Sequence, residues 1–461
     1  MVEEKELEQE LFAVGTRLAE ALPSNARRPL KALDDKAMDF ASRDAELKAA
    51  LFRFVDVVPA CRNMDDLARH LTGFLREVEE PPPPIAVAMR MGESRTGRAA
   101  LGRAAATGVK HMAHRFIVGE DPAAAMGDLR ELWKDGVASS VDLLGEATVT
   151  QTEAQRYAAR CSEALETLVA QSAKWPERPR LERDAAGPLP RANLSVKVSA
   201  LTPLLRADAP ERGKRDAAER LRGLLRQARE LGAHLHIDME SLDSRDAVLE
   251  LVLELLAEAE FREGPSAGLV LQAYLRDSPE SLDTIHAWLD GDGAGRAQPL
   301  TVRLVKGAYW DHEIVEARQH GWDVPVFDVK ADSDRNFEQL TRRLLDARTD
   351  GCGLRVAIAS HNLRSIAHAI AYNRLTGGRD EDLELQILRG LGDPLQEALA
   401  EQDLRVRAYC PVGDLVAGMA YLVRRLLENT SNDSFLADQA RGAGIEELLA
   451  PPGSAGAARA T

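Results

Sequence analysis

The 461-residue chain has few cysteines, few aromatic residues and no long apolar run. Its four cysteines, Cys61, Cys161, Cys352 and Cys410, lie far apart without a C-x-x-C pair, which argues against a disulfide framework or a zinc ribbon and fits a reducing cytosol. No apolar stretch reaches the roughly 18 to 20 residues that a membrane span needs. The acidic opening MVEEKELEQE is unlike a signal or transit peptide. We therefore expect a cytoplasmic protein, in contact with the inner face of the cell membrane only peripherally.

An excess of positive charge is also missing. Asp and Glu number 74 against 59 Lys and Arg, for a formal net charge of −15. Broad nucleic-acid binding needs a basic face, so the composition argues against a nucleic-acid partner. No G-x-G-x-x-G follows the first predicted strand, which argues against a dinucleotide-binding Rossmann fold.

The first 135 residues or so have the periodicity of helices. Apolar residues recur near a 3.6-residue period in 47–58, 64–78 and 95–117, and the prolines of 81–84 separate the last two. This pattern predicts an all-helical N-terminal region.

Short β-branched runs then recur, each followed by a helical pattern. They are ASSVDLL (138–144), LSVKVSAL (194–201), HLHIDME (234–240), AGLVLQAY (267–274), LTVRLVKGA (300–308), LRVAIAS (354–360), LELQIL (383–388) and VRAYCPV (406–412). Eight strands alternating with helices predict an α/β protein with a closed (βα)8 barrel of the TIM type. We expect an irregular loop over 175–192 and a linker-like tail.

These patterns divide the chain into four predicted parts. They are an N-terminal helical arm (1–40), a helical domain (41–135), the barrel (136–436) and a C-terminal tail or linker (437–461).

Polar residues occur at nearly all the predicted strand ends. In a barrel of this kind, side chains at the carboxyl ends of the strands face the active site. Those concerned are Lys197, Asp238, Gln272, Tyr274, Arg303, Lys306, Tyr309, Ser360, His361, Asn362, Gln386 and Tyr409. This set predicts a site for a polar, anionic ligand.

Two adjacent arginines, Arg424 and Arg425, follow the eighth strand in MAYLVRRLLENTSNDSF (419–435). Paired guanidinium groups suit a carboxylate or a phosphate, which their N–H groups bind in a forked geometry. The alternative is a solvated surface pair that interacts with Glu428 one turn later. The helix alone does not decide between these interpretations.

HLHID (234–238) suggests a rival function. The pattern puts His234 and His236 on one face of a strand together with Asp238, as in the metal sites of barrel hydrolases. Those enzymes usually carry the pair on the first strand, with further histidines on later strands. A metal-dependent hydrolase is therefore the alternative hypothesis, and packing of His234 inside the barrel is the simpler explanation.

Taken together, the motifs resemble those of proline dehydrogenases, and more closely those of the N-terminal half of bifunctional proline utilization A. The matching stretches are DLLGEA (142–147), SVKVSAL (195–201), HIDMES (236–241), LVLQAYLRD (269–277), VRLVKGAYWDHE (302–313), SHN (360–362) and the double-arginine stretch, with FRFVDVVPA (52–60) and HRFIVGE (114–120) upstream. The resemblance covers about residues 35 to 440. It implies a distorted barrel, non-covalent FAD and oxidation of L-proline to Δ1-pyrroline-5-carboxylate.

The resemblance also implies roles for residues. Arg424 and Arg425 would bind the proline carboxylate with Lys197, while Glu146 would pair with the first arginine and gate the pocket. The pyrrolidine ring would pack against Leu304, Tyr309 and Tyr409, with Asp238 nearby. The flavin contacts would be Val270, Gln272, Arg303, Val305, Gly307, Trp310, Ser333, Ser360, His361, Asn362, Gln386, Glu428, Ser434 and Phe435. Among these, Arg303 would lie near the reactive flavin nitrogen.

Hydride would leave the ring carbon beside the proline nitrogen for the flavin, and a quinone would then take the electrons. A quinone implies transient contact with a membrane. Residues 388–394 (LRGLGDP) depart from the family's usual stretch at this place. The sequence contains neither a ribbon-helix-helix repressor nor the aldehyde dehydrogenase half of the bifunctional proteins. A pyrroline-5-carboxylate dehydrogenase is thus an expected partner, covalent or separate, and a piece of a longer chain and a monofunctional protein both remain open.

Overall fold

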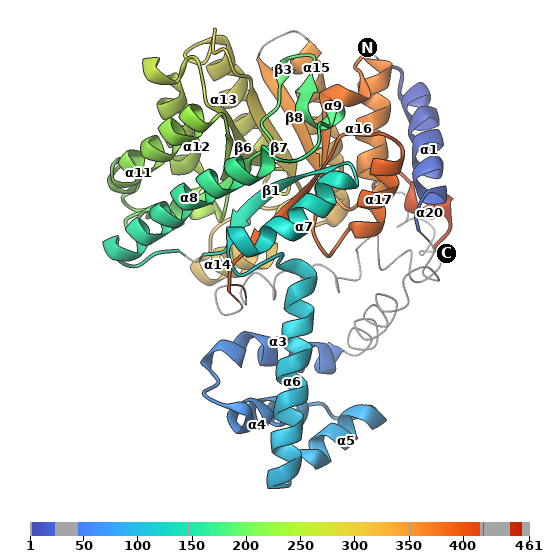
Figure 1. The fold of residues 1–461 in the computed structure, drawn as a ribbon. Coiled ribbons are helices and arrows are strands. Elements are labelled where there is room, and N and C mark those ends of the chain that lie inside the picture. Colours follow the sequence, from blue (N-terminus) through green and yellow to red (C-terminus); the bar gives the residue numbers. More distant parts are fainter. Residues whose placement is uncertain are drawn as a thin grey trace.

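The computed structural model describes residues 2–23, 45–145, 147–349, 353–414, 418 and 443–453. A barrel forms the larger part of the molecule, and a smaller group of helices projects from one end of it (Figure 1). This end is the one at which the barrel strands finish, because Gly119, just after the projecting helices, pairs with Val412 at the last position of the eighth strand.

The barrel is a closed ring of eight parallel strands. In chain order they are β1 (Val137–Leu143), β4 (Asn193–Lys197), β5 (His234–Asp238), β6 (Ser266–Gln272), β7 (Leu300–Val305), β8 (Leu354–Ala359), β9 (Leu383–Leu388) and β10 (Val406–Val412). Neighbours in sequence are neighbours in the sheet, and β1 closes the ring by pairing with both β10 and β4. The prediction of a (βα)8 barrel is confirmed.

The barrel interior is polar, and the layer around it is apolar. On β7, for example, Val302 and Leu304 are fully buried in the main hydrophobic core, whereas the side chain of Arg303 bonds across the barrel. Successive strand residues point to opposite faces, so one sequence supplies both surfaces. This alternation leaves a column of polar side chains along the barrel axis.

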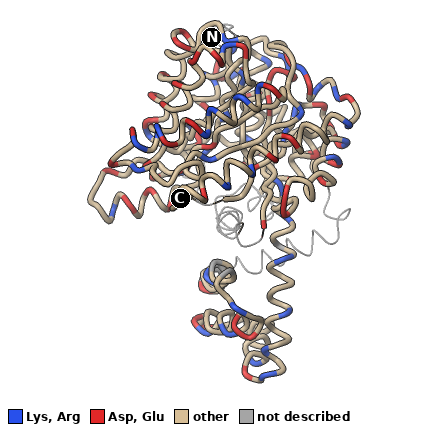
Figure 2. The backbone as a smooth tube through the Cα atoms, turned by 60° about the vertical axis from the view of Figure 1, so that its left-hand side comes forward, with Lys and Arg blue, Asp and Glu red and all other residues tan. Residues whose placement is uncertain are grey.

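Helices cover the outside of the ring. They are α7 (Pro122–Lys134), α8 (Gln151–Ser172), α10 (Val198–Leu201), α11 (Pro210–Leu231), α12 (Leu242–Ala257), η3 (Ala259–Phe261), α13 (Ser278–Asp290), α14 (Trp310–His320), α15 (Lys330–Thr349), α16 (Leu363–Leu375), η4 (Asp380–Asp382) and α17 (Asp393–Glu401). Acidic and basic residues are interspersed over the outside of this part of the molecule (Figure 2). Among the described residues, no helix is long and apolar enough to cross a membrane.

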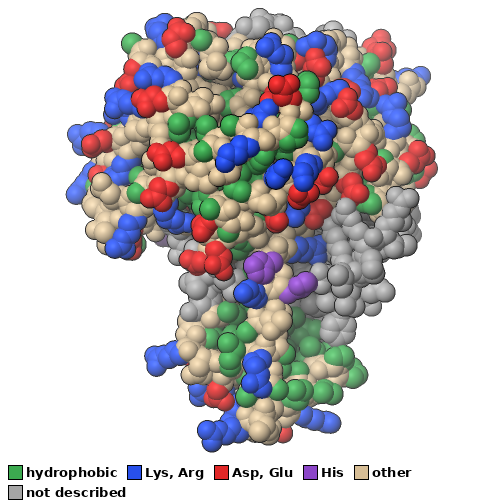
Figure 3. Space-filling model, in the orientation of Figure 1, with side chains coloured by type: hydrophobic (Ala, Val, Ile, Leu, Met, Phe, Trp, Pro, Cys, Tyr) green, Lys and Arg blue, Asp and Glu red, His purple; other side chains and the backbone are tan. Residues whose placement is uncertain are grey.

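The projecting helices are α3 (Ala45–Val57), η2 (Val58–Ala60), α4 (Met64–Leu75), α5 (Pro83–Met91) and α6 (Arg95–Phe116). Asn63 and Ser94 cap α4 and α6 by accepting a backbone N–H at the third residue of each helix. The helices share an apolar core that also includes Leu144 and Leu391 from the carboxyl end of the barrel, and further apolar side chains lie on the visible surface of this part (Figure 3). The helical character predicted for this region is confirmed, whereas the domain boundaries drawn from the sequence stay predictions.

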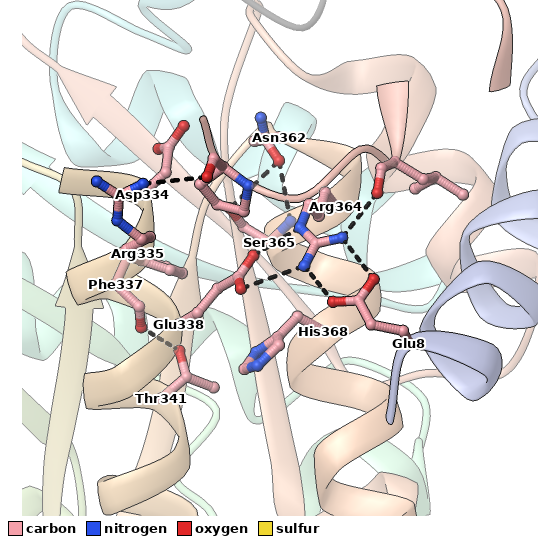
Figure 4. Close-up of polar contacts among 12 residues, drawn as sticks. Glu8, Asp334, Arg335, Phe337, Glu338, Thr341, Asn362, Arg364, Ser365 and His368 are labelled. Carbon is pink, nitrogen blue, oxygen red and sulfur yellow. Dashed lines mark hydrogen bonds and ion pairs between the residues drawn. The ribbon is translucent and has the colours of Figure 1, made fainter. Parts of the chain in front are cut away.

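The N-terminal helix α1 (Glu4–Glu20) packs against α16, far from it in sequence (Figure 1). Buried Arg364 on α16 binds Glu8 of α1, Glu338 of α15 and the carbonyl oxygen of Leu449 (Figure 4). Leu449 follows the short helix α20 (Ile445–Leu448) and is itself buried. Leu449 also fills the space beside Gly15 of α1. Part of the predicted tail is therefore packed against the folded protein.

The segment 175–192 also differs from the expected irregular loop. It contains α9 (Pro179–Glu182) and a two-stranded hairpin of β2 (Arg183–Asp184) and β3 (Gly187–Pro188). The hairpin lies at the amino-terminal end of the barrel, because Asp184 binds Arg355 at the start of β8 with Nε to Oδ2 at 2.8 Å. In Figure 1 this end is the upper one, opposite the projecting helices.

Candidate active site

Three of the predicted site residues meet around the carboxylate of a fourth, Asp238, at the carboxyl end of the barrel. Asp238, the last residue of β5, accepts hydrogen bonds at Oδ1 from Arg303 Nη1 (2.9 Å) and Ser195 Oγ (2.8 Å). Its Oδ2 accepts one from the Tyr409 hydroxyl at 2.6 Å and lies 3.5 Å from Lys197 Nζ. We call Lys197, Asp238, Arg303, Tyr409 and their partners the Asp238 network.

Charge in this network is balanced by a residue that the motif reading had not singled out as a site residue. Lys197 Nζ donates to the carboxylate of Asp142 on β1, so two cations face two carboxylates. Burial alone would lower the pKa of Lys197, but Asp142 and Asp238 outweigh it and raise that pKa. Burial would likewise raise the pKa of Asp238, and Lys197 and Arg303 bring it below its ordinary value. Both groups are therefore charged at neutral pH.

Tyr409 closes the network from β10. Burial, with Asp142 and Asp238 nearby, raises the pKa of its hydroxyl well above the ordinary value, so the group stays protonated and donates to Asp238. The guanidinium carbon of Arg303 lies 5.2 Å from the centre of the Tyr409 ring. This cation–π contact fixes both side chains.

Three more polar residues complete the network, and the strand-end rule did not select them. Ser195 binds Asp238, and Ser140 accepts from Arg303 Nη2 at 3.2 Å and donates to Asn193 at 2.8 Å. The sequence did contain a signal for these residues. Ser195 stands two residues before Lys197 on its strand, and Ser140 two residues before Asp142, so the members of each pair point to the same face of the strand.

Two glutamines lie elsewhere in the barrel interior. Gln272, the last residue of β6, donates from Nε2 to the Glu240 carbonyl at 2.9 Å, while its buried Oε1 has no hydrogen-bond partner among the described residues. Gln386 on β9 donates to Glu384 Oε1 at 2.6 Å, two residues towards the amino-terminal end. The structure thus does not join these two residues to the Asp238 network through a hydrogen bond.

The turn after β7 brings the backbone close to an aromatic ring. Gly307 has φ +130°, a conformation that L side chains rarely adopt, and a Cβ there would clash with the Tyr274 ring. Lys306 beside it binds Asp334, which also binds Lys330. These contacts tie the carboxyl end of β7 to the start of α15, where Ser333 is buried.

Helix α14 begins at Trp310, three residues after Gly307. Trp310 is 41 % exposed and donates from its ring nitrogen to the Phe327 carbonyl at 2.9 Å. Tyr309 is half-buried beside the small apolar cluster that contains Tyr274. Large aromatic side chains thus lie beside the carboxyl end of β7.

Ser360, His361 and Asn362 form the turn between β8 and α16. Asn362 caps α16 by accepting the backbone N–H of Ser365 at 2.9 Å, and its own N–H donates to Ser360 Oγ at 3.1 Å. His361 Nε2 accepts the backbone N–H of Leu388 at 3.0 Å, which links this turn to the end of β9. The turn is thus held in one conformation at the carboxyl end of the barrel.

Three apolar candidates lie on strands β6 and β7. Val270 and Val305 alternate with the core-facing residues of their strands and lie near the carboxyl ends. Leu304 is fully buried and stands between Arg303 and Val305, so it faces the layer between strands and helices. This direction does not favour the predicted contact of Leu304 with a substrate ring.

The remaining candidates, Glu146, Arg424, Arg425, Glu428, Ser434 and Phe435, lie outside the described residues.

The rival metal site is not supported by the contacts of its members. His234 binds Ser266 at 2.8 Å and His236 at 3.2 Å, while Asp238 is held by the network above. Burial, with Arg407, lowers the pKa of His234 to about 3, and burial with Arg303 lowers that of His236 well below its ordinary value. In the described part of the chain, no group of three or more His, Cys, Asp or Glu residues is arranged to hold a metal ion.

Comparison with known proteins places this barrel in a family. Residues 125–438 match the family model for proline dehydrogenase, and residues 8–116 match that for the proline utilization A N-terminal domain. The chain is 32 % identical over 352 residues to the bifunctional protein PutA of Salmonella typhimurium, an alignment that covers 74 % of this chain and 25 % of that protein. Over 329 residues it is 27 % identical to the proline dehydrogenase of Deinococcus radiodurans, covering 71 % of this chain and 89 % of that one.

Solved structures give the same result. The crystal structure of proline utilization A from Bdellovibrio bacteriovorus, inactivated by N-propargylglycine, superposes with a TM-score of 0.84 at 34 % identity, covering 97 % of this chain and 44 % of that one. The chain thus spans about a quarter of the length of its bifunctional PutA relative from Salmonella and under half of the Bdellovibrio protein. Barrel, helical region and family models agree, and the chain belongs to the proline dehydrogenase family.

Proposed function

We propose that this chain is an FAD-dependent proline dehydrogenase, which oxidises L-proline to Δ1-pyrroline-5-carboxylate. The observation that carries the proposal is the Asp238 network, a charge-balanced polar cluster at the carboxyl end of the barrel. Active sites of (βα)8 barrels form at this end. The family supports the choice of substrate.

The described residues fit a flavin. Gln272 Oε1 and Arg303 Nε are both buried without a hydrogen-bond partner, and they supply one acceptor and one donor. A flavin ring has donors and acceptors along its edge, so it suits both. The residues that would hold FAD are Val270, Gln272, Arg303, Val305, Gly307, Trp310, Ser333, Ser360, His361, Asn362, Gln386, Glu428, Ser434 and Phe435.

Proline would bind through its carboxylate. Lys197 is a protonated amine at the mouth of the barrel, and Arg424 and Arg425 would complete the cationic pocket. Glu146 would pair with Arg424 and control access. Charge-assisted hydrogen bonds to a carboxylate are strong and directional, so they would fix the orientation of the ring.

Bound FAD would supply the redox chemistry by accepting hydride from the ring carbon next to nitrogen. The protein's share is to position the ring. Tyr309 and Tyr409 would pack against it. Tyr409 is kept in place by its hydrogen bond to Asp238, which Arg303 in turn holds.

We extend the proposal to the partners. Electrons would pass from the reduced flavin to a quinone, which requires transient contact with a membrane. The product would pass to a pyrroline-5-carboxylate dehydrogenase, either covalently attached or separate. The proposed dehydrogenase partner is supported by relatives that are bifunctional PutA proteins, of which this chain covers only a part.

Colour tests the proposal most directly. Purified full-length chain is expected to be yellow, with a flavin absorption band that L-proline bleaches under anaerobic conditions. A colourless protein that does not bind added FAD would overturn the proposal. Retained flavin that no amino acid bleaches would indicate a binding protein, whereas bound zinc with chelator-sensitive hydrolysis would favour the hydrolase.

Arg425→Met tests the carboxylate pocket. Each lost charge-assisted contact is worth roughly 1.5 to 3 kcal/mol, so we expect the KM for proline to rise about tenfold or more. Affinity for FAD, measured by fluorescence titration, should stay the same. Arg226→Met is a matched control, because Arg226 forms a surface ion pair with Glu260 and should leave KM unchanged. An unaltered KM in Arg425→Met would contradict the assignment.

A further inference from the structure

A second polar cluster lies at the opposite, amino-terminal end of the barrel. Three arginines occupy it, Arg355 on β8, Arg405 just before β10, and Arg407 on β10, and they are 4 %, 2 % and 3 % exposed. Together with Glu384, Asn193 and Gln386, whose amide points down the barrel to Glu384, they line a cavity of about 20 Å³. A single water molecule needs a cavity of roughly 10 to 15 Å³. The cavity is therefore large enough for one or two water molecules or small ions and too small for a metabolite.

The arginines share two carboxylates. Asp184 of the hairpin accepts from Arg355 through both of its oxygens and from Arg405 Nη1 at 3.1 Å. Glu384 accepts from Arg407 Nε at 2.8 Å and from its Nη2 at 3.0 Å. Burial alone would raise the pKa of Glu384, but Arg407 and Arg405 outweigh it and hold that pKa below its ordinary range.

The cluster therefore has one positive charge in excess, from three guanidinium groups and two carboxylates. Arginine does not lose its proton in proteins, so titration does not remove this charge. His234, which also lines the cavity, is neutral because its pKa is lowered to about 3. Outside the lining, Arg348 and Arg379 are matched by Asp382 and Glu381, two charges of each sign. At the other end of the barrel, Lys197 and Arg303 are already balanced by Asp142 and Asp238.

Two polar atoms of the cluster have no hydrogen-bond partner, and both are donors. They are Arg355 Nη1 and Arg405 Nε, each fully buried and without a partner among the described residues, and Glu384 Oε2 lies 4.0 Å from Arg405 Nε. No lining residue has an acceptor among the buried atoms without partners. A water molecule would accept from these donors but would leave the excess positive charge in place. A monatomic anion only accepts, and it also cancels the excess charge.

We propose that the amino-terminal end of the barrel is a binding site for one small monovalent anion of the chloride type. The anion accepts hydrogen bonds from Arg355 Nη1 and Arg405 Nε beneath the hairpin that carries Asp184. It stabilises the closed barrel at the end remote from the active site, and it takes no part in the oxidation of substrate.

Bromide gives a crystallographic test, because it replaces chloride and is located by anomalous scattering. Crystals of the flavin-loaded chain grown in sodium bromide are expected to show an anomalous peak within hydrogen-bond distance of Arg355 Nη1 and Arg405 Nε. Ordered water there without bromide, in crystals that bind bromide elsewhere, would overturn the proposal.

Thermal unfolding tests the site in solution. At constant ionic strength, replacing gluconate, which is too large for the cavity, by chloride should raise Tm saturably, by about 2 °C or more. Arg405→Met should abolish this rise. Arg296→Met is the matched control and should keep it, because Arg296 is also largely buried but binds only the carbonyls of Leu256, Phe261 and Pro265. A bromide peak without a rise in Tm on addition of chloride would mean an adventitious ion only, and would overturn the proposal. If Arg405→Met does not fold, the presence or absence of the bromide peak in the unaltered protein tests the site.

Discussion

Asp238→Asn is expected to slow the anaerobic bleaching of the flavin by proline about a hundredfold. Asp238 is the point at which four side chains meet, and the amide removes the only carboxylate that Arg303 binds among the described residues. Arg303 and Tyr409 would then lose their fixed positions, and small misplacements of reacting groups cost rates of this order. Stopped-flow absorbance at saturating proline measures the effect.

Stability has to be separated from function in this variant. Removing one partner of a buried ion pair destabilises a protein by roughly 3 to 5 kcal/mol, so Asp238→Asn should also lower the free energy of unfolding. Asp184→Asn is the matched control, since Asp184 is equally buried in ion pairs but at the other end of the barrel. It should lose comparable stability and keep the bleaching rate. Equal rates for Asp238→Asn and the unaltered enzyme would exclude Asp238 from the reaction.

Gly307→Ala is expected to destabilise the folded enzyme by about 3 kcal/mol or more and to weaken FAD binding. Two costs combine, the backbone conformation at φ +130° and the clash of the new Cβ with the Tyr274 ring. Relief of the clash would move the turn after β7, where the flavin contacts Val305 and Trp310 are proposed. Urea unfolding and the dissociation constant for FAD measure the two effects.

Gly321→Ala isolates the backbone component. Gly321 ends α14 with φ +68°, and nothing lies within 4 Å of a Cβ at that position. Strain alone should cost roughly 1 kcal/mol there and leave FAD binding intact. A Gly307→Ala variant no less stable than Gly321→Ala would contradict the steric account of the turn.

The sequence alone determined the architecture. Eight β-branched runs alternating with helical patterns require parallel βαβ units, and that number of units closes into a barrel. The rule that active sites form at the carboxyl ends then selected Lys197, Asp238, Arg303 and Tyr409, which do meet in one network. Periodicity is a local property of the sequence. It was therefore sufficient to predict both the barrel and the end of the barrel at which the site lies.

Only the tertiary structure decided which side chains share charge. Arg303 and Ser140 are 163 residues apart and become partners because closure of the ring places β1 across the axis from β7. The hairpin in 175–192 looked like an irregular loop, because its strands are two residues each. Its main contact is the carboxylate of Asp184, which binds Arg355 on β8 and Arg405 just before β10. Pairings of this kind depend on the register and closure of the whole barrel, which no local pattern encodes.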